Sequence, residues 1–156
     1  MAPLLPCRSH KARVPPDLPA LAGLFASAFL AGSILPAQSE AVLAALLLGA
    51  AQPPWLLVMM ATIGNVAGAV LNYVLGRSAE RFRHRRWFPL SAASWDRSAA
   101  WFNRWGVATL LLSWVPIIGD GFTVLAGAAR TRLVLFLALV TLAKGGRYAL
   151  LAAALG

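Results

Sequence analysis

A run of 59 residues, positions 18–76, contains one charged side chain, Glu40. Most of the other residues are Leu, Ala, Val, Ile and Gly. Soluble domains do not contain runs of this kind, because about a quarter of their residues are charged. A bilayer is the solvent that suits the run, and a transmembrane helix needs roughly 17–25 residues. The run therefore predicts a membrane protein.

The positive charges border the apolar segments. The chain is 60% hydrophobic and 12% charged, with a net charge of +9. Bases flank apolar runs in this way where the positive-inside rule orients a membrane protein, and this pattern argues against nucleic-acid binding. One cysteine and two isolated histidines predict no metal site, and no cofactor is expected. The bases are Arg8, Lys11 and Arg13; seven arginines from Arg77 to Arg104; and Arg130 and Arg132.

Prolines divide the first apolar run into residues 18–35, 37–52 and 54–76. The first and third pieces are long enough to cross the membrane. The middle piece would be a helix of about 24 Å, short of a hydrocarbon core of roughly 30 Å. The basic N-terminal tail and the basic centre are both expected in the cytoplasm, so an even number of crossings separates them. We therefore expect residues 36–52 to form a re-entrant segment on the periplasmic side.

A second interrupted segment covers residues 105–129, where Asp120 is the one charged residue. Pro116, Gly119 and Gly121 divide it into two arms of about ten residues. A break of this kind predicts a re-entrant hairpin that returns to its side of entry. Residues 133–156 then cross once, which puts the C-terminus in the periplasm.

The expected fold is an all-α membrane protein with about three transmembrane helices and two re-entrant hairpins. Pro36 precedes Glu40 by four residues, and Pro116 precedes Asp120 by four. This recurrence predicts an inverted repeat, an architecture of many secondary transporters. Pro36, Pro116, Gly119 and Gly121 are the expected hairpin-breaking residues.

Two parts of the chain differ in character from the apolar segments. Residues 1–17 predict a disordered, basic cytoplasmic tail, and residues 18–156 a single membrane domain. Within that domain, residues 77–105 form a basic cytoplasmic connector. Its second half, with Ser94 as N-cap and Trp101 and Trp105 on its apolar face, predicts an amphipathic helix in the interface.

Glu40 and Asp120 are the acids of the apolar segments, and each has two interpretations. Glu40 is either a hydrated residue in the first turn of a helix capped by Ser39, or a protonatable group facing a polar cavity. Asp120, between two glycines in a broken segment, has the same two interpretations. An ionisable residue inside a membrane segment is expensive, which favours function.

Lys144 and Arg147 are the matching bases, near the middle of the last span and on one helical face. Pairing them with the two acids would offset much of their desolvation cost. The resulting cluster is either a static ion-pair network or a switchable one that binds an anion or relays protons. Asn65 and Asn72 are two amides that need partners in lipid and are expected to line the same polar cavity.

Three helical faces carry small residues at intervals of four, and such faces favour close helix packing. They are Gly23, Ser27 and Ala31; Gly64, Gly68, Asn72 and Gly76; and Gly145, Ala149 and Ala153.

Four blocks, in residues 24–43, 62–77, 111–130 and 144–148, keep a characteristic order and spacing. They include Pro36 with Glu40, and Pro116 with Asp120. These blocks resemble the small YqaA-type branch of the bacterial DedA (VTT-domain, SNARE-associated-Golgi-like) inner-membrane family. The resemblance implies two re-entrant hairpins, transport of lipids such as undecaprenyl phosphate or phospholipids, and a role in envelope integrity. Glu40 matches the family's acidic residue in the first hairpin.

Two departures from the family pattern bear on the substrate. Ala37 replaces the usual glycine after the hairpin proline. Trp114 and Gly119 stand where larger members tend to have arginines, which are natural ligands of a lipid phosphate, and Lys144 and Arg147 could take their place.

The sequence hypothesis is a proton-coupled transporter or flippase of a lipid or small anionic substrate in the bacterial inner membrane. Glu40 and Asp120 would be its protonatable pair, Lys144 and Arg147 its anion-binding or counter-ion pair. The alternative is a structural or assembly protein, including a homo-oligomer joined through the glycine faces. No enzyme motif is present, so catalysis is not expected. Anionic lipid headgroups are the expected partners of the arginines from Arg77 to Arg104.

Overall fold

The computed structural model describes residues 17–33, 38–78, 92–115 and 118–155, and all regular elements within these ranges are helices. The all-α class expected from the sequence is therefore confirmed for the described residues. In chain order the elements are α1 (Leu18–Gly32), α2 (Ser39–Leu48), α3 (Pro54–Arg77), α5 (Ala92–Trp105), the 3-10 helix η1 (Gly106–Trp114), α6 (Ile118–Ala128) and α7 (Leu133–Leu155).

Two of these helices are long and apolar enough to cross a membrane, α3 with 24 residues and α7 with 23. Both exceed a hydrocarbon core of roughly 30 Å at about 1.5 Å per residue. The third expected span is shorter, because α1 has 15 residues and measures about 22 Å by the same rise. The structure therefore supports two long helices among the described residues, where the sequence predicted about three.

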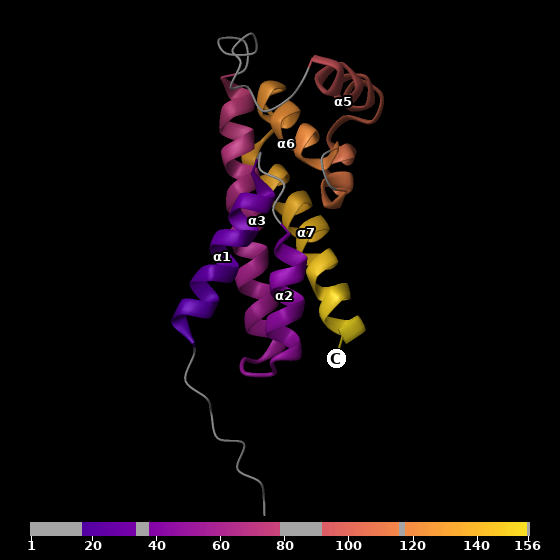
Figure 1. Cartoon of the computed structure of the whole chain (residues 1–156). Helices are drawn as coiled ribbons and strands as arrows, with labels where there is room; N and C mark the ends of the chain where they lie inside the picture. Colours follow the sequence, from indigo (N-terminus) through magenta and orange to yellow (C-terminus); the bar gives the residue numbers. More distant parts are fainter. Residues whose placement is uncertain (1–16, 34–37, 79–91, 116–117, 156) are drawn as a thin grey trace, which may run out of the picture.

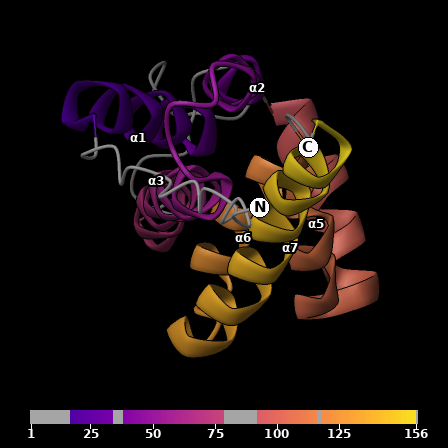
Figure 2. The ribbon, with the colours of Figure 1, turned by 90° about the horizontal axis from the view of Figure 1, so that it is seen from below.

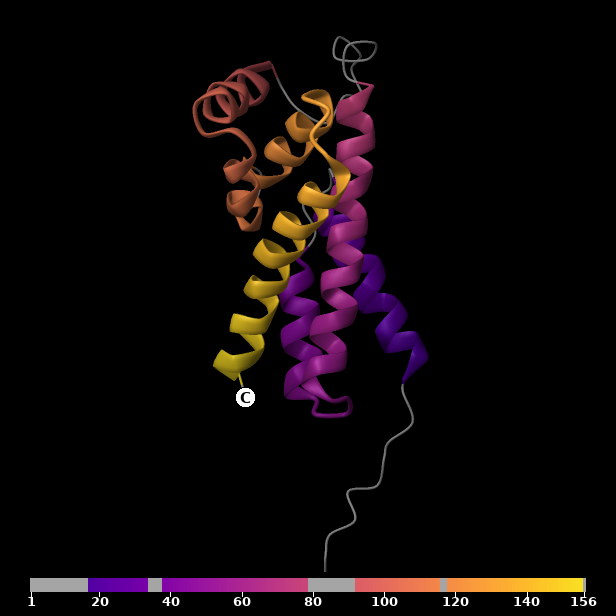
Figure 3. The same cartoon turned by 180° about the vertical axis from the view of Figure 1, so that it is seen from behind.

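The short helices are arranged in two pairs, each followed by a long helix (Figures 1 and 3). α1 runs to the middle of the molecule and α2 runs back beside it, before α3 extends over the full length. η1 and α6 form the second pair from the other end, before α7 runs back past them. The first pair thus consists of α1 and α2. The sequence instead predicted that residues 18–35 span the membrane and that residues 36–52 form a separate re-entrant segment.

This arrangement brings the start of α1 and the end of α7 to the same end of the molecule (Figure 1). The end of α3 and α5 lie at the other end. Seen along the long axis, α1 and α2 lie on one side and α5 on the opposite side, with α3 and α7 between them (Figure 2).

The glycine face of α3 packs against the backbones of two other helices. A Cβ built on Gly64 would lie 2.5 Å from the carbonyl oxygen of Phe25 in α1, and one on Gly68 would clash with Phe29. At the other end of α3, a Cβ on Gly76 would clash with the carbonyl oxygen of Val124 in α6. Helices approach this closely only where Cβ atoms are absent, so the predicted packing role of this face is confirmed.

The other two small-residue faces do not pack in this way. No neighbouring atom lies within 4 Å of a Cβ built on Gly23, and the one on Gly145 would meet only the side chain of Thr62. The buried face of α1 is a different one, made of Leu21, Leu24, Ala28 and Gly32.

Two separate apolar cores lie along the length of α3. The first contains Leu24 of α1, Leu43 of α2 and Leu57 of α3. The second contains Tyr73 of α3 and Phe122 of α6, together with residues of η1 and α7. Each short-helix pair therefore has its own core, and α3 contributes to both.

α1 ends at Gly32 and α2 begins at Ser39, whereas η1 ends at Trp114 and α6 begins at Ile118. Pro36 and Pro116, which were predicted to break the segments, lie outside the described residues. Gly119 and Gly121, which were predicted to break the second segment, lie instead within α6 and are buried. Gly119 has a packing role: a Cβ there would lie 2.6 Å from the carbonyl oxygen of Ser113 in η1.

Helix α5 confirms a helix in the connector but begins at Ala92, so Ser94 is inside it and is not its N-cap. Phe102 packs against the second core. Trp101 and Trp105 are 50% and 61% exposed, and Arg104 lies over the Trp105 ring. Residues 79–91 and residues 1–16 of the predicted tail lie outside the described residues. Asp17, the last residue of the predicted tail, is instead the N-cap of α1.

Replacing Gly76 with alanine should destabilise the fold, because the new methyl group overlaps the backbone of α6. Overpacking of this kind costs about 1–3 kcal/mol. The matched control is Gly146→Ala in α7, where a Cβ meets no atom within 4 Å and where alanine favours the helix. Thermal unfolding in detergent should show a lower midpoint for Gly76→Ala alone. Equal midpoints for the two variants would contradict the close packing.

Candidate functional site

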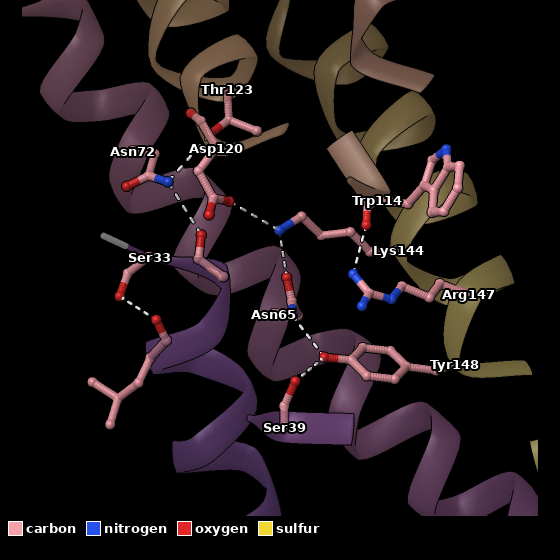
Figure 4. Close-up of polar contacts among 12 residues, drawn as sticks. Ser33, Ser39, Asn65, Asn72, Trp114, Asp120, Thr123, Lys144, Arg147 and Tyr148 are labelled. Atoms are coloured by element: carbon pink, nitrogen blue, oxygen red, sulfur yellow. Dashed lines mark hydrogen bonds and ion pairs between the residues drawn. The ribbon is translucent and has the colours of Figure 1, made fainter. Parts of the chain in front are cut away.

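Polar side chains from four helices meet in the middle of the molecule, where the two short-helix pairs approach α3 and α7 (Figure 4). The cluster includes all six side chains singled out as substrate- or proton-binding from the sequence. Three further members are hydroxyl groups, discussed below. The six are Glu40 of α2, Asn65 and Asn72 of α3, Asp120 of α6, and Lys144 and Arg147 of α7.

The two acids occupy equivalent positions in the two helix pairs. Glu40 lies in the first turn of α2, and Asp120 lies in the first turn of α6. The N-terminal end of each helix carries unpaired N–H groups and a partial positive charge, which stabilise a nearby carboxylate. Both acids therefore lie at helix N-terminal ends that point to the middle of the molecule.

Lys144 is the buried base of the cluster, 5% exposed. Its Nζ donates to Asn65 Oδ1 and lies 3.4 Å from Asp120 Oδ1. The ammonium group thus has an amide and a carboxylate as partners. Such pairing is needed, because a buried charge without a partner costs several kcal/mol.

Arg147 lies one helical turn further along α7 and joins both helix pairs. Its Nη2 is 2.8 Å from Glu40 Oε1, and its Nη1 donates to the main-chain oxygen of Trp114 at 2.6 Å. Glu40 belongs to the first pair, and Trp114 ends η1 in the second. This ion pair is more open than the other one, with side chains about one third exposed.

Tyr148 connects α7 to α2 and α3, and sequence reasoning did not select it. Its Oη accepts a hydrogen bond from Asn65 Nδ2 at 2.6 Å and shares another with Ser39 Oγ at 2.7 Å. Ser39 was predicted to cap α2, but Gln38 holds the cap position and Ser39 is the first helical residue. The spacing of four from Lys144 to Tyr148 places both on one helical face and was the available signal.

Asn72 anchors the far end of the cluster and is fully buried. Its Nδ2 donates to the carbonyl oxygen of Gly32 and to Thr123 Oγ1, both at 3.2 Å. Thr123 in turn donates to the main-chain oxygen of Asp120. Asn72 thereby ties the end of α1 to the start of α6. Its Oδ1 is buried without a hydrogen-bond partner among the described residues, a rare condition for a polar atom.

The cluster is electrically balanced, with two acids and two bases, and each acid has one base. No group of three potential metal ligands occurs among the described residues. The arrangement suits proton binding and anion binding, because protonation of either acid leaves the positive charge of its basic partner uncompensated.

The Lys144–Asp120 pair predicts a specific pattern of stabilities. Lys144→Met leaves the carboxylate of Asp120 without its partner. The free energy of unfolding should fall by an amount near the lower end of about 3–5 kcal/mol, because Asp120 is partly exposed. The double variant with Asp120→Asn should be more stable than Lys144→Met alone, since no unpaired charge remains. Unfolding in detergent measures the cycle. Additive losses would show that the two groups do not interact.

Comparison with known proteins gives the family. Residues 35–155 match the model of the VTT domain. The inner membrane protein YqaA of Escherichia coli (strain K12) is 42% identical over 136 residues, 86% of this chain and 89% of that protein. YqaA of Shigella flexneri matches equally, and an uncharacterized protein of Haemophilus influenzae is 34% identical over 132 residues, 80% of each chain. No solved structure matches. The chain belongs to the VTT-domain family and is a membrane protein of its YqaA/DedA type.

Proposed function

We propose that this protein is a proton-coupled transporter or flippase of a lipid or a small anionic substrate in the bacterial inner membrane, supporting envelope integrity. The observation that carries the proposal is the cluster of two acid–base pairs between the short-helix pairs. Charged groups at membrane depth are expensive and are retained mainly where they bind or move charge. A relative named as an inner membrane protein supports the location.

The proposed membrane arrangement follows from helix length. α3 and α7 cross the bilayer, and the two short-helix pairs are re-entrant hairpins that enter from opposite faces. The halves α1–α3 and η1–α7 then form an inverted repeat, with the hairpin ends meeting near the middle of the membrane. Broken helices in such folds direct their ends at the substrate site, as α2 and α6 do with Glu40 and Asp120.

The orientation in this proposal follows the charges. The end of α3 with Arg77, and α5 with Arg97 and Arg104, face the cytoplasm, and the end of α7 faces the periplasm. The start of α1 then also lies on the periplasmic side, which departs from the cytoplasmic N-terminus expected from the sequence. α5 lies in the cytoplasmic interface, where Trp101 and Trp105 meet the lipid and Arg97 and Arg104 meet anionic headgroups.

Glu40 and Asp120 are the proposed proton carriers, and Lys144 and Arg147 the groups that receive the anionic substrate. Asn65 and Asn72 hold the site in shape. The alternative is a structural or assembly protein whose charge pairs only stabilise the fold. The ion-pair geometry is compatible with both functions, so a variant that separates them is required. We propose no chemical reaction at this site.

Glu40→Gln tests the proposed transport. Proteoliposomes would be loaded with labelled undecaprenyl phosphate or phospholipid under an imposed pH gradient, and movement across the bilayer measured. We expect gradient-dependent movement with the wild type and its reduction to the protein-free background with Glu40→Gln, because the amide binds no proton. The amide still accepts hydrogen bonds, so the folded fraction should remain near that of the wild type.

Asp96→Asn is the matched control, because it makes the same change at an exposed carboxylate of α5. It should move lipid as the wild type does. Background movement with the folded wild-type protein would remove the support for lipid transport. A Glu40→Gln variant that unfolds at lower temperature while retaining movement would favour the structural alternative.

A further inference from the structure

The helix η1 is long for a helix of its type. It runs for nine residues, Gly106–Trp114. Runs of 3-10 helix longer than three or four residues are uncommon, because their hydrogen-bond geometry is poorer than that of an α-helix. Such a stretch often marks a hinge or a segment under strain. The same nine residues would form about two and a half turns of α-helix, so an α form is the natural alternative.

The burial of side chains in η1 follows its threefold geometry. Leu110 and Ser113, three residues apart, are buried, whereas Leu111 and Trp114 are 42% and 49% exposed. Residues three apart in a 3-10 helix lie directly above one another. Thr109 Oγ1 also donates to the main-chain oxygen three residues earlier, at 2.8 Å. Packing of the buried face in the second core therefore holds η1 in the 3-10 form.

One buried group of η1 is not satisfied in this form. Ser113 is 3% exposed, and its Oγ has no hydrogen-bond partner among the described residues. A buried hydroxyl without a partner is costly. In an α-helix a serine hydroxyl can donate to the main-chain oxygen four residues earlier, here that of Thr109. The smaller rise of an α form would bring this oxygen closer, so the α form offers a partner that the 3-10 form does not.

The junction between α5 and η1 is a glycine in an unusual conformation. Gly106 has a φ of +59°, which interrupts the helical path between the two elements. No atom of the described residues lies within 4 Å of a Cβ built there, so close packing does not require glycine. The backbone conformation does, because glycine adopts positive and negative φ about equally. This junction can therefore change conformation at little cost.

The other end of η1 contacts α7. The main-chain oxygen of Trp114 accepts a hydrogen bond from Arg147 Nη1 at 2.6 Å (Figure 4). Gly119 of α6 presents no side chain to the main chain of Ser113, so this surface is smooth. The rise per residue is about 2.0 Å in a 3-10 helix and about 1.5 Å in an α-helix, so conversion shortens nine residues by roughly 4–5 Å. A displacement of that size breaks the bond between Trp114 and Arg147.

We propose that η1 converts between a 3-10 form and an α form, with Gly106 as the hinge, and that conversion to the α form releases Arg147 from the main chain of Trp114. In the 3-10 form, η1 joins the second short-helix pair to α7. In the α form, its Trp114 end withdraws toward α5. Packing of Leu110 stabilises the first form, and the Ser113 hydroxyl stabilises the second. Packed helices switch between discrete arrangements of this kind, and the conversion requires no substrate.

The distance between spin labels on η1 and α7 tests the conversion in the full chain. The labels would be attached after Trp114→Cys and Leu150→Cys, at side chains 49% and 74% exposed, with Cys7→Ser removing the remaining cysteine. The main-chain oxygen that binds Arg147 is unaffected by these changes. Dipolar broadening in continuous-wave electron paramagnetic resonance, in lipid nanodiscs, should show two distances that differ by up to roughly 4–5 Å. The longer distance belongs to the α form.

Two substitutions should move the ratio of the two forms in opposite directions. Gly106→Ala should favour the α form by at least about fivefold, because alanine is strained at positive φ. Ser113→Ala should favour the 3-10 form by about two- to tenfold, because it removes a hydroxyl that is paired only in the α form. Gly23→Ala is the matched control. A Cβ at this position of α1 meets no described atom within 4 Å, so the ratio should not change.

Three results would overturn the conversion. One is a single distance in the wild type and in both variants. Another is a shift in the same direction by Gly106→Ala and Ser113→Ala, as expected from a general loosening of the fold. If Gly106→Ala fails to fold, Ser113→Ala decides, and an unchanged ratio or a shift to the longer distance is the third. Two forms in a protein that moves no lipid would refute the proposed transport alone, whereas a single form in a transporting protein would refute the conversion alone.

Discussion

The structure depends on the approach of α3 to two other helices at backbone distance. Gly64 and Gly68 admit the backbone of α1, and Gly76 admits that of α6. Without a hydrophobic driving force between helices in lipid, contact of this kind is a main source of association. It holds each short-helix pair against the same long helix, at opposite ends. The starts of α2 and α6 are thereby directed toward the middle, where the polar cluster forms.

The contacts within the polar cluster compensate the cost of burying charged groups in that region. These contacts are distributed over both halves of the molecule. Asn72 ties the end of α1 to α6, Tyr148 ties α7 to α2 and α3, and Arg147 bridges α2 and the end of η1. Each buried donor must be satisfied where water is excluded. Movement of one half against the other would therefore break a defined set of bonds, and the Arg147–Glu40 pair is the most exposed of these.

Much of this could be predicted from residue chemistry. The apolar runs predicted a membrane protein, and the second segment was correctly divided into two short arms, now η1 and α6. The matching of two acids with two bases followed from the cost of burying unpaired charge. The partner of each acid did not, because spacing along α7 places Lys144 and Arg147 on one face without saying which helix lies opposite. Tyr148 was missed because a tyrosine in an apolar helix is usually a core residue.

The sequence by itself determined which segments are apolar, which charges must be paired and which face of α3 carries the glycines. Tertiary structure decided the rest. Residues 18–35 are long enough to cross, but α1 ends at Gly32, packed against the backbone of Asn65. Gly119 marked a break by composition but serves as a contact surface for η1. The physical reason is the same in both cases. Hydropathy and local propensity are properties of a segment, whereas the end of a helix and the partner of a charge depend on the backbone that lies against it.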